Sequence, residues 1–246
     1  MPSQDSTSAN SIPESPAAPL EVPGFGSTGQ FSAGDPNLNE DVALALLKQN
    51  EVSPEDLDRL SKSTVVAKSR KLRLAIVEHP RTPRYVSMSM LRTLFTFDLM
   101  RVALAPSVPG DIKRAAEETL IHRLETISPG EKLSLARRAS GRVAGALLVD
   151  SEPRVIQAAL ENARLTEPPI VRTLMRPDTP ASFVQALCRH PKWSLRREVR
   201  VALLRNDKTP ATYAIEIARG LPAQLLKEIL QNSRLPEETK SLLRQG

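Results

Sequence analysis

The chain has 246 residues, of which 25% are charged and 40% hydrophobic, values ordinary for a globular protein that can bury a sizeable core. Only eight residues are aromatic, and because strands favour aromatic and β-branched side chains whereas Ala and Leu favour helices, the composition indicates an all-α protein. The single cysteine, Cys188, excludes an intramolecular disulfide and paired-cysteine metal or redox sites, and we expect it to be a buried, inert thiol.

The net charge of +6 is divided unevenly along the chain. Residues 1–60 carry ten acidic and two basic side chains, a net charge of −8, whereas residues 61–246 carry a net charge of +14. This cationic body favours an anionic partner or a contact with the acidic N-terminal segment itself. No stretch approaches the roughly 18 apolar residues of a membrane helix, and no targeting signal is evident, so we expect a cytoplasmic protein.

The first segment, residues 1–38, is rich in Ser, Pro, Gly, Ala and Asn. It has too few large apolar side chains to offset the entropy lost on ordering, so we predict a disordered tail. Phe25 and Phe31 offer anchor points for a short docking motif, and the alternative that we favour is an unstructured linker. The letters GFGSTG, residues 24–29, match a dinucleotide-binding pattern without the strand and helix that such a site requires.

A helical-repeat domain is predicted over residues 39–246. The run NEDVALALLKQ places Val42, Ala43, Leu46 and Leu47 on one helical face. In the following SPEDLDRLSK, Ser53 is a good N-cap and the next residue, a proline, fits the first helical position.

Proline then punctuates the sequence at intervals of 20 to 30 residues, at positions 83, 109, 129, 153, 180, 210 and 236. Five prolines, counting Pro54, directly follow a hydroxyl residue, which we expect to cap the helix that begins there. These residues are Ser53, Thr82, Ser128, Thr179 and Thr209. Ser128 and Glu131 also have the spacing of a capping box.

Each preceding helix is expected to close on an apolar residue and a sharp turn. Asn206 and Asn232 lie four residues before their prolines, where we predict the left-handed conformation that Asn tolerates, and His79 occupies the same place. The repeating unit is therefore a helix, a sharp turn and a capped helix, with a period of about 26 residues. One unit cannot bury its own apolar face, so we predict a stack, an α-solenoid of short helix pairs.

Four segments carry a resemblance to known repeat families: LRLAIVEHPRTPRYV, RTLMRPDTPASFVQAL, VRVALLRNDKTPATYAIEIA and KEILQNSRLPEETKSLL. They resemble the leucine-rich-repeat-variant proteins, in which an Asn-Pro-x-Thr-Pro-like turn joins short helices, and more loosely they are similar to HEAT and armadillo repeats. The resemblance covers residues 64–246 and implies an α-solenoid. The repeat here is longer and irregular, and the cysteine cluster that accompanies an iron–sulfur site in some members is missing, so the resemblance implies no cofactor and no functional residue.

Motifs of catalytic chemistry are absent from the sequence, which has no GxSxG, no phosphate-binding loop and no HExxH. His79, His122 and His190 have no metal-ligand spacing, so we expect no metal site. Asp98 is the one acidic residue inside a strongly apolar stretch, where a buried carboxylate could be catalytic. We favour a helix that begins at Thr96 and places Asp98 at its second position, where it interacts with the helix dipole.

The candidate partner-binding residues form three basic clusters. They are Lys68, Arg70 and Lys71; Arg138 and Arg142; and Arg196, Arg197 and Arg200 with Trp193 at the start of a helix. Stacked helices would align these clusters into a basic stripe, and the alternative is an ordinary solvated face.

Two packing expectations accompany these clusters. Leu195 is predicted on the core face of its helix together with Val199, Ala202 and Leu203. The small residues Gly141, Ala144 and Gly145 are expected to let a neighbouring helix approach closely.

These features favour a non-enzymatic scaffold that binds another protein through an extended surface, with Trp193 as the expected hot spot. The alternative partner is nucleic acid, bound as a duplex through its phosphates, because the low aromatic content argues against single-strand stacking. A HEAT-like DNA glycosylase ranks last, because few aromatic and acidic residues are available for it. No membrane partner is expected, and the oligomeric state stays open.

Overall fold

The computed structural model describes residues 38–49 and 51–245. In this part of the chain every regular element is a helix, as the composition predicts: sixteen α-helices and one short 3-10 turn. Leu38, the last residue of the predicted tail, is buried in the core. The rest of that tail, with Phe25, Phe31 and the GFGSTG segment, lies outside the described residues.

In chain order the helices are α1 (Glu40–Leu47), α2 (Pro54–Ser61), α3 (Thr64–Lys68), α4 (Arg70–Glu78), α5 (Arg84–Leu91), α6 (Thr96–Leu104), α7 (Gly110–Arg123), α8 (Pro129–Arg138), α9 (Gly141–Ala146), η1 (Leu147–Val149), α10 (Pro153–Leu160), α11 (Glu167–Leu174), α12 (Ala181–Arg189), α13 (Arg197–Arg205), α14 (Ala211–Arg219), α15 (Ala223–Gln231) and α16 (Glu237–Gln245).

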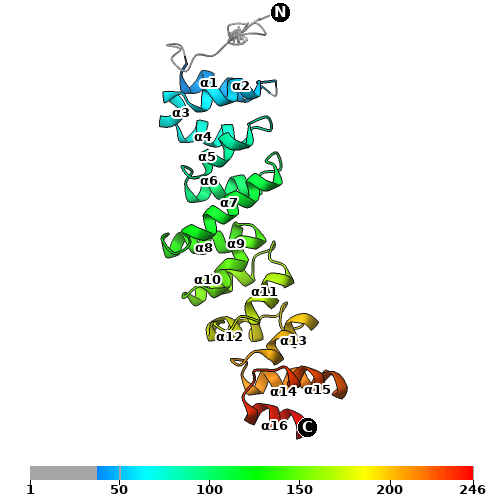
Figure 1. Cartoon of the computed structure of the whole chain (residues 1–246). Helices are drawn as coiled ribbons and strands as arrows, with labels where there is room; N and C mark the ends of the chain where they lie inside the picture. Colours follow the sequence, from blue (N-terminus) through cyan, green and yellow to red (C-terminus); the bar gives the residue numbers. More distant parts are fainter. Residues whose placement is uncertain (1–37, 50, 246) are drawn as a thin grey trace, which may run out of the picture.

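The helices stack in layers along an elongated body, with α1 and α16 at opposite ends of it (Figure 1). Two rows of helices run along it. In the even-numbered row α4 packs on α6, α8 on α10, α10 on α12 and α14 on α16, while in the odd-numbered row each helix from α5 to α13 packs on the next odd-numbered one. One continuous cluster of buried apolar side chains extends through the stack from Leu38 to Leu243.

The turns between successive helices fall on two edges of the stack. Edge A holds the turns that follow α4, α6, α8, α10, α12 and α14, and edge B holds those that follow α5, α7, α9, α11, α13 and α15. Hydrogen bonds join turns of the same edge. On edge A the Ser107 hydroxyl donates to the Glu78 carbonyl oxygen over 3.1 Å, and on edge B the Arg123 guanidinium donates to the Leu94 carbonyl oxygen over 2.6 Å. These donors satisfy carbonyls that lie at or just beyond the end of a helix and would otherwise lack a partner.

The serine caps are confirmed, whereas the threonine caps are wrong. Ser53 accepts from the backbone N–H of Asp56, and Ser128 forms the predicted capping box with Glu131. The hydroxyls of the three threonines instead reach backward, to carbonyls in the last turn of the preceding helix. Thr82 donates to Ile76, Thr179 to Thr173 and Thr209 to Leu203, over 2.6, 2.6 and 2.7 Å. The following proline holds the N-cap position itself, with an extended ψ near 140° in each case.

The predicted left-handed turns do not form. Asn206 has φ −94° and Asn232 has φ −107°, and no described residue has a positive φ. Asn206 is buried and uses its side chain to close the turn, because its Oδ1 accepts from the backbone N–H of Lys208 over 2.9 Å. The chain can thus turn sharply without the backbone strain that a left-handed residue carries.

The small residues of α9 do permit close approach. A Cβ atom on Gly141 would lie 2.2 Å from the Arg164 carbonyl oxygen, and one on Gly145 would lie 2.9 Å from the Cβ of Pro169 in α11. The thiol of Cys188 is buried, also as predicted. Leu195, in contrast, is 75% exposed, because α13 begins only at Arg197 and the leucine precedes its first turn.

Candidate functional site: a basic edge

Exposed cations gather on edge A of the C-terminal half, at the four turns that follow α8, α10, α12 and α14. We call this surface the basic edge and define it by Arg137, Arg138, Arg164, Arg189, Lys192, Arg196, Arg197 and Arg219. Among the described residues, none of these eight forms an ion pair. The acidic residues at the same turns are Glu161, Glu167 and Glu198, so the cations outnumber them.

The turns of the basic edge are held together by buried hydrogen bonds. The Asn162 side-chain amide, in the turn after α10, donates to the carbonyl oxygens of Ala136 and Ala139 over 2.7 and 3.2 Å. Its Oδ1 accepts from the backbone N–H of Arg164 over 2.7 Å, and the Arg164 guanidinium donates to the Arg138 carbonyl oxygen over 3.3 Å. Two neighbouring turns, and the arginines on them, are therefore fixed relative to each other.

Trp193 likewise joins two neighbouring turns of the basic edge, those that follow α10 and α12. Its indole Nε1 donates to the Leu160 carbonyl oxygen over 2.8 Å, and only 3% of the residue is exposed. His190 ends α12 and accepts from the backbone N–H groups of Lys192 and Trp193, while the Lys192 ammonium lies 4.1 Å from the centre of the indole ring. Trp193 therefore joins layers inside the stack and offers no exposed surface for a partner, unlike the hot spot that the sequence suggested.

Arg200 also has a structural partner. Its Nη2 donates to the Ile217 carbonyl oxygen near the end of α14 over 3.1 Å. A Cβ atom on Gly220 would lie 2.8 Å from that nitrogen, so glycine leaves the room that the guanidinium occupies. This contact links the start of α13 to the turn after α14, which places Arg196, Arg197 and Arg219 on one edge.

In the second predicted cluster, Arg138 and Arg142, only one of the two arginines lacks an ion-pair partner among the described residues. Arg142 forms ion pairs with Glu118 over 2.9 Å and with Glu117 over 3.8 Å, both from α7. Arg138 is exposed and belongs to the basic edge. Two of the three predicted clusters thus lie on the same edge. Within them, Arg142 is paired with glutamates of α7 and Arg200 donates to a backbone carbonyl, so neither is available to a partner in the same way as the exposed arginines.

The first predicted cluster lies on the opposite edge. Arg70 makes a two-pronged ion pair with the buried carboxylate of Asp98 over 2.7 and 2.9 Å, and the carboxylate raises the pKa of the guanidinium. Lys71 lies 3.8 Å from Glu40, and Lys68 is exposed. This cluster sits at the N-terminal end of α4, on edge B, so it does not extend the basic edge.

Asp98 has a structural explanation. It is the third residue of α6, which begins at Thr96 as predicted, and its side chain is 7% exposed. Both carboxylate oxygens accept from Arg70, so the buried charge is paired. The residue stabilises the contact between α4 and α6, and this geometry does not resemble a catalytic acid or base.

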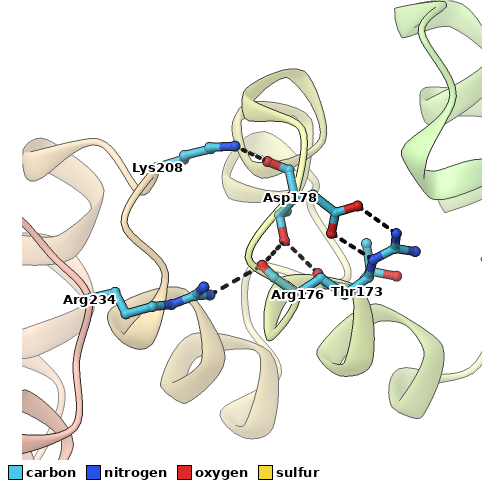
Figure 2. Close-up of polar contacts among 6 residues, drawn as sticks. Thr173, Arg176, Asp178, Lys208 and Arg234 are labelled. Atoms are coloured by element: carbon cyan, nitrogen blue, oxygen red, sulfur yellow. Dashed lines mark hydrogen bonds and ion pairs between the residues drawn. The ribbon is translucent and has the colours of Figure 1, made fainter.

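Edge B of the C-terminal half has cations too, and several of them are engaged (Figure 2). Arg176 forms a two-pronged pair with Asp178 over 2.9 and 2.7 Å, which raises the pKa of the guanidinium and lowers that of the carboxyl. Lys208 donates to the Thr179 carbonyl oxygen, and Arg234 donates to the carbonyl oxygens of Arg176 and Leu174, both over 3.3 Å. Described edge B cations that are exposed and lack an ion pair, such as Arg154 and Arg172, are fewer than the eight of the basic edge.

Leu195 is the residue of this surface that sequence reasoning misplaced. Among the described residues it is the most exposed of the large apolar side chains, and it lies between Lys192 and Arg196 in the turn after α12. Its spacing of four from Val199 suggests a shared helical face, which holds only for residues inside the helix. Pro191 marks the end of the preceding helix, but no local pattern indicates that the next helix begins only at Arg197.

Other kinds of site are not evident in the part of the chain that the structure describes. No group of three or more His, Cys, Asp or Glu side chains is arranged to hold a metal ion. Within residues 38–49 and 51–245, none of the helices combines the length and apolar character that a membrane crossing requires. Comparison with protein families, curated proteins and solved structures gives no match.

Proposed function

We propose that this chain is a non-enzymatic helical-repeat scaffold that binds an acidic segment of another protein through the basic edge. One observation carries the proposal: eight exposed cations from four consecutive turns of edge A lack ion-pair partners, whereas several edge B cations of the same half are engaged. Unpaired like charges held close together repel one another, and an anionic partner would relieve that repulsion.

The stacked helices support the architectural part of the proposal. Two rows of helices, with packing between neighbours in each row and turns on two edges, are the arrangement expected of a HEAT-like or leucine-rich-repeat-variant-like α-solenoid. Such a stack presents an extended surface on which successive turns supply successive contacts. The hydrogen bonds of Asn162, Trp193 and Arg200 hold those turns in place, so little ordering entropy would be lost on binding.

Leu195 favours protein over nucleic acid as the partner. A leucine that is 75% exposed among cations gains free energy when an apolar side chain covers it. An acidic protein segment can supply both the carboxylates and the apolar contact. A duplex bound through its phosphates would leave the leucine against a charged, hydrated backbone.

The experiment compares two fluorescein-labelled probes on the full chain over a salt series. One is a peptide of about 20 residues in which single Leu residues interrupt Glu residues, and the other is a DNA duplex of about 20 base pairs. We expect the peptide to bind, and its affinity to fall about tenfold or more in the triple variant Arg138→Glu, Arg196→Glu, Arg197→Glu.

The matched control is the triple variant Lys48→Glu, Lys68→Glu, Arg92→Glu, which makes the same change of net charge at exposed cations outside the basic edge. It should retain most of the affinity for the peptide, with a loss of about twofold at most from long-range charge. Equal losses in the two variants, or tight duplex binding with a steep salt dependence and no peptide binding, would overturn the proposal.

A further inference from the structure

A groove of about 680 Å³ lies at the C-terminal end of the stack, among α14, α15 and α16. One face of α15 lines it with Ala223, Leu226, Lys227, Leu230 and Gln231. These residues follow the spacing of three and four that places side chains on a single helical face. The groove is therefore an extended strip along a helix and not a small gap between side chains.

The remaining walls are largely apolar as well. Ile215, Ala218 and Leu221 contribute from α14 and the turn that follows it, and Leu242 and Leu243 contribute from α16. Leu242 is 53% exposed, so an apolar side chain that covers it would gain free energy. In the odd-numbered row α11 packs on α13 and α13 on α15, and α15 is the last described helix of that row.

The charge around the groove has one sign. Arg219, Lys227 and Arg244 line it, and its described lining contains no acidic side chain. A second copy of this chain would bring the same three cations against them, which is unfavourable in a symmetric contact. An occupant with carboxylates beside its apolar side chains would be attracted to all three.

We propose that this groove is a docking site for an amphipathic helix of a partner protein, with apolar side chains on one face and acidic residues flanking them. The helix would lie against α15 and α16 and cover Leu242, as a further helix of the row would. The groove is separate from the binding site proposed on the basic edge, although the two share Arg219 at the end of α14.

The test is a selection from a displayed library of random peptides of about 20 residues, long enough for several helical turns. The library is panned against the full chain and counter-selected against the variant Leu242→Glu, which places a carboxylate at the groove. We expect enriched peptides with apolar residues at spacings of three and four and an excess of Asp and Glu. Enriched peptides that are basic, or that lack this spacing, would refute the inference.

Synthesised peptides from the selection are then measured by fluorescence anisotropy. Leu242→Glu and Lys227→Glu should each weaken binding about tenfold or more. The matched control Met88→Glu changes another exposed apolar residue, on α5, and should leave the affinity unchanged. An equal loss of peptide affinity in Met88→Glu would contradict the inference. So would sedimentation that shows a dimer of the full chain which dissociates in the Leu242→Glu variant, because the groove would then be a dimer interface. Because Arg138, Arg196 and Arg197 lie outside the groove, their variants separate failure of this site from failure of the basic edge.

Discussion

The Asn206 side-chain amide donates to the Leu174 carbonyl oxygen over 2.7 Å, joining two fully buried residues that are 32 positions apart in sequence. The oxygen of the same amide accepts from the N–H of Lys208, two residues ahead in its own turn. The same two contacts, one within the turn and one to a carbonyl oxygen of an earlier layer, occur in three other turns. The residues are Asn162, His79 and Ser233, and the carbonyls belong to Ala136, Gln49 and Leu204 respectively. In these four turns a single polar residue thus shapes the turn and fastens it to the preceding layer.

Replacement of Asn206 by Ala should lower the free energy of unfolding by about 1–3 kcal/mol. The Lys208 N–H loses its acceptor, and the buried Leu174 carbonyl keeps only the longer bond from Arg234, over 3.3 Å. Urea denaturation followed by circular dichroism measures the change. Asn232→Ala is the control, because Asn232 is exposed and the equivalent bonds at that turn come from Ser233, one residue later. A similar loss for both variants would contradict the role assigned to Asn206.

Gly141→Ala should destabilise the stack by about 1–3 kcal/mol or more, because the added methyl would meet a backbone carbonyl that cannot move without its turn. The matched change Gly130→Ala adds the same methyl to α8, where no atom lies within 4 Å. Its stability should be unchanged or raised by less than about 1 kcal/mol, since Ala is the better helix former. Thermal unfolding of the two variants side by side checks the difference, and equal behaviour would mean that α9 can shift away from Arg164.

Local chemistry explains which parts of the fold could be predicted. A serine before a proline or a helical run caps the helix that follows, and the structure places Ser53 and Ser128 as expected, because cap and helix are neighbours in sequence. The same rule fails for the threonines at positions 82, 179 and 209. A hydroxyl in a tight turn can reach either helix. With proline already at the N-cap, the threonine donates to a carbonyl of the preceding helix, one that also accepts a backbone N–H.

The basic edge was harder to predict from the sequence than the helix caps. The three basic clusters are visible in the sequence, but the edge on which each lies depends on the direction of its helix. Arg70 lies where α4 begins on edge B, and Arg197 lies where α13 begins on edge A. The carbonyl that receives the Trp193 indole is 33 residues away, so no local pattern reveals that the ring is buried.

Burial raises the pKa of the Cys188 thiol to about 11, so the thiol stays protonated until the pH approaches that value. At pH 8 only about one molecule in a thousand would carry a thiolate, against roughly a quarter for an unperturbed cysteine. Iodoacetamide should therefore modify the native chain at least about a hundredfold more slowly than the chain unfolded in urea. Mass spectrometry of timed samples gives both rates, and a native rate within tenfold of the unfolded one would contradict the burial of this thiol.

Trp193 and Leu195 should give opposite results when each is replaced. Trp193→Phe keeps an aromatic ring but removes the N–H that serves the Leu160 carbonyl oxygen, so stability should fall by about 1–3 kcal/mol. Binding of the acidic peptide should persist in that variant under conditions where it remains folded, because the indole is buried. Leu195→Ser removes an exposed side chain, so stability should change by less than about 0.5 kcal/mol while peptide affinity falls. Urea denaturation and anisotropy on the same two preparations measure both quantities. If Trp193→Phe weakens binding and leaves stability intact, the tryptophan contacts the partner directly, and the leucine is not the apolar contact of the basic edge.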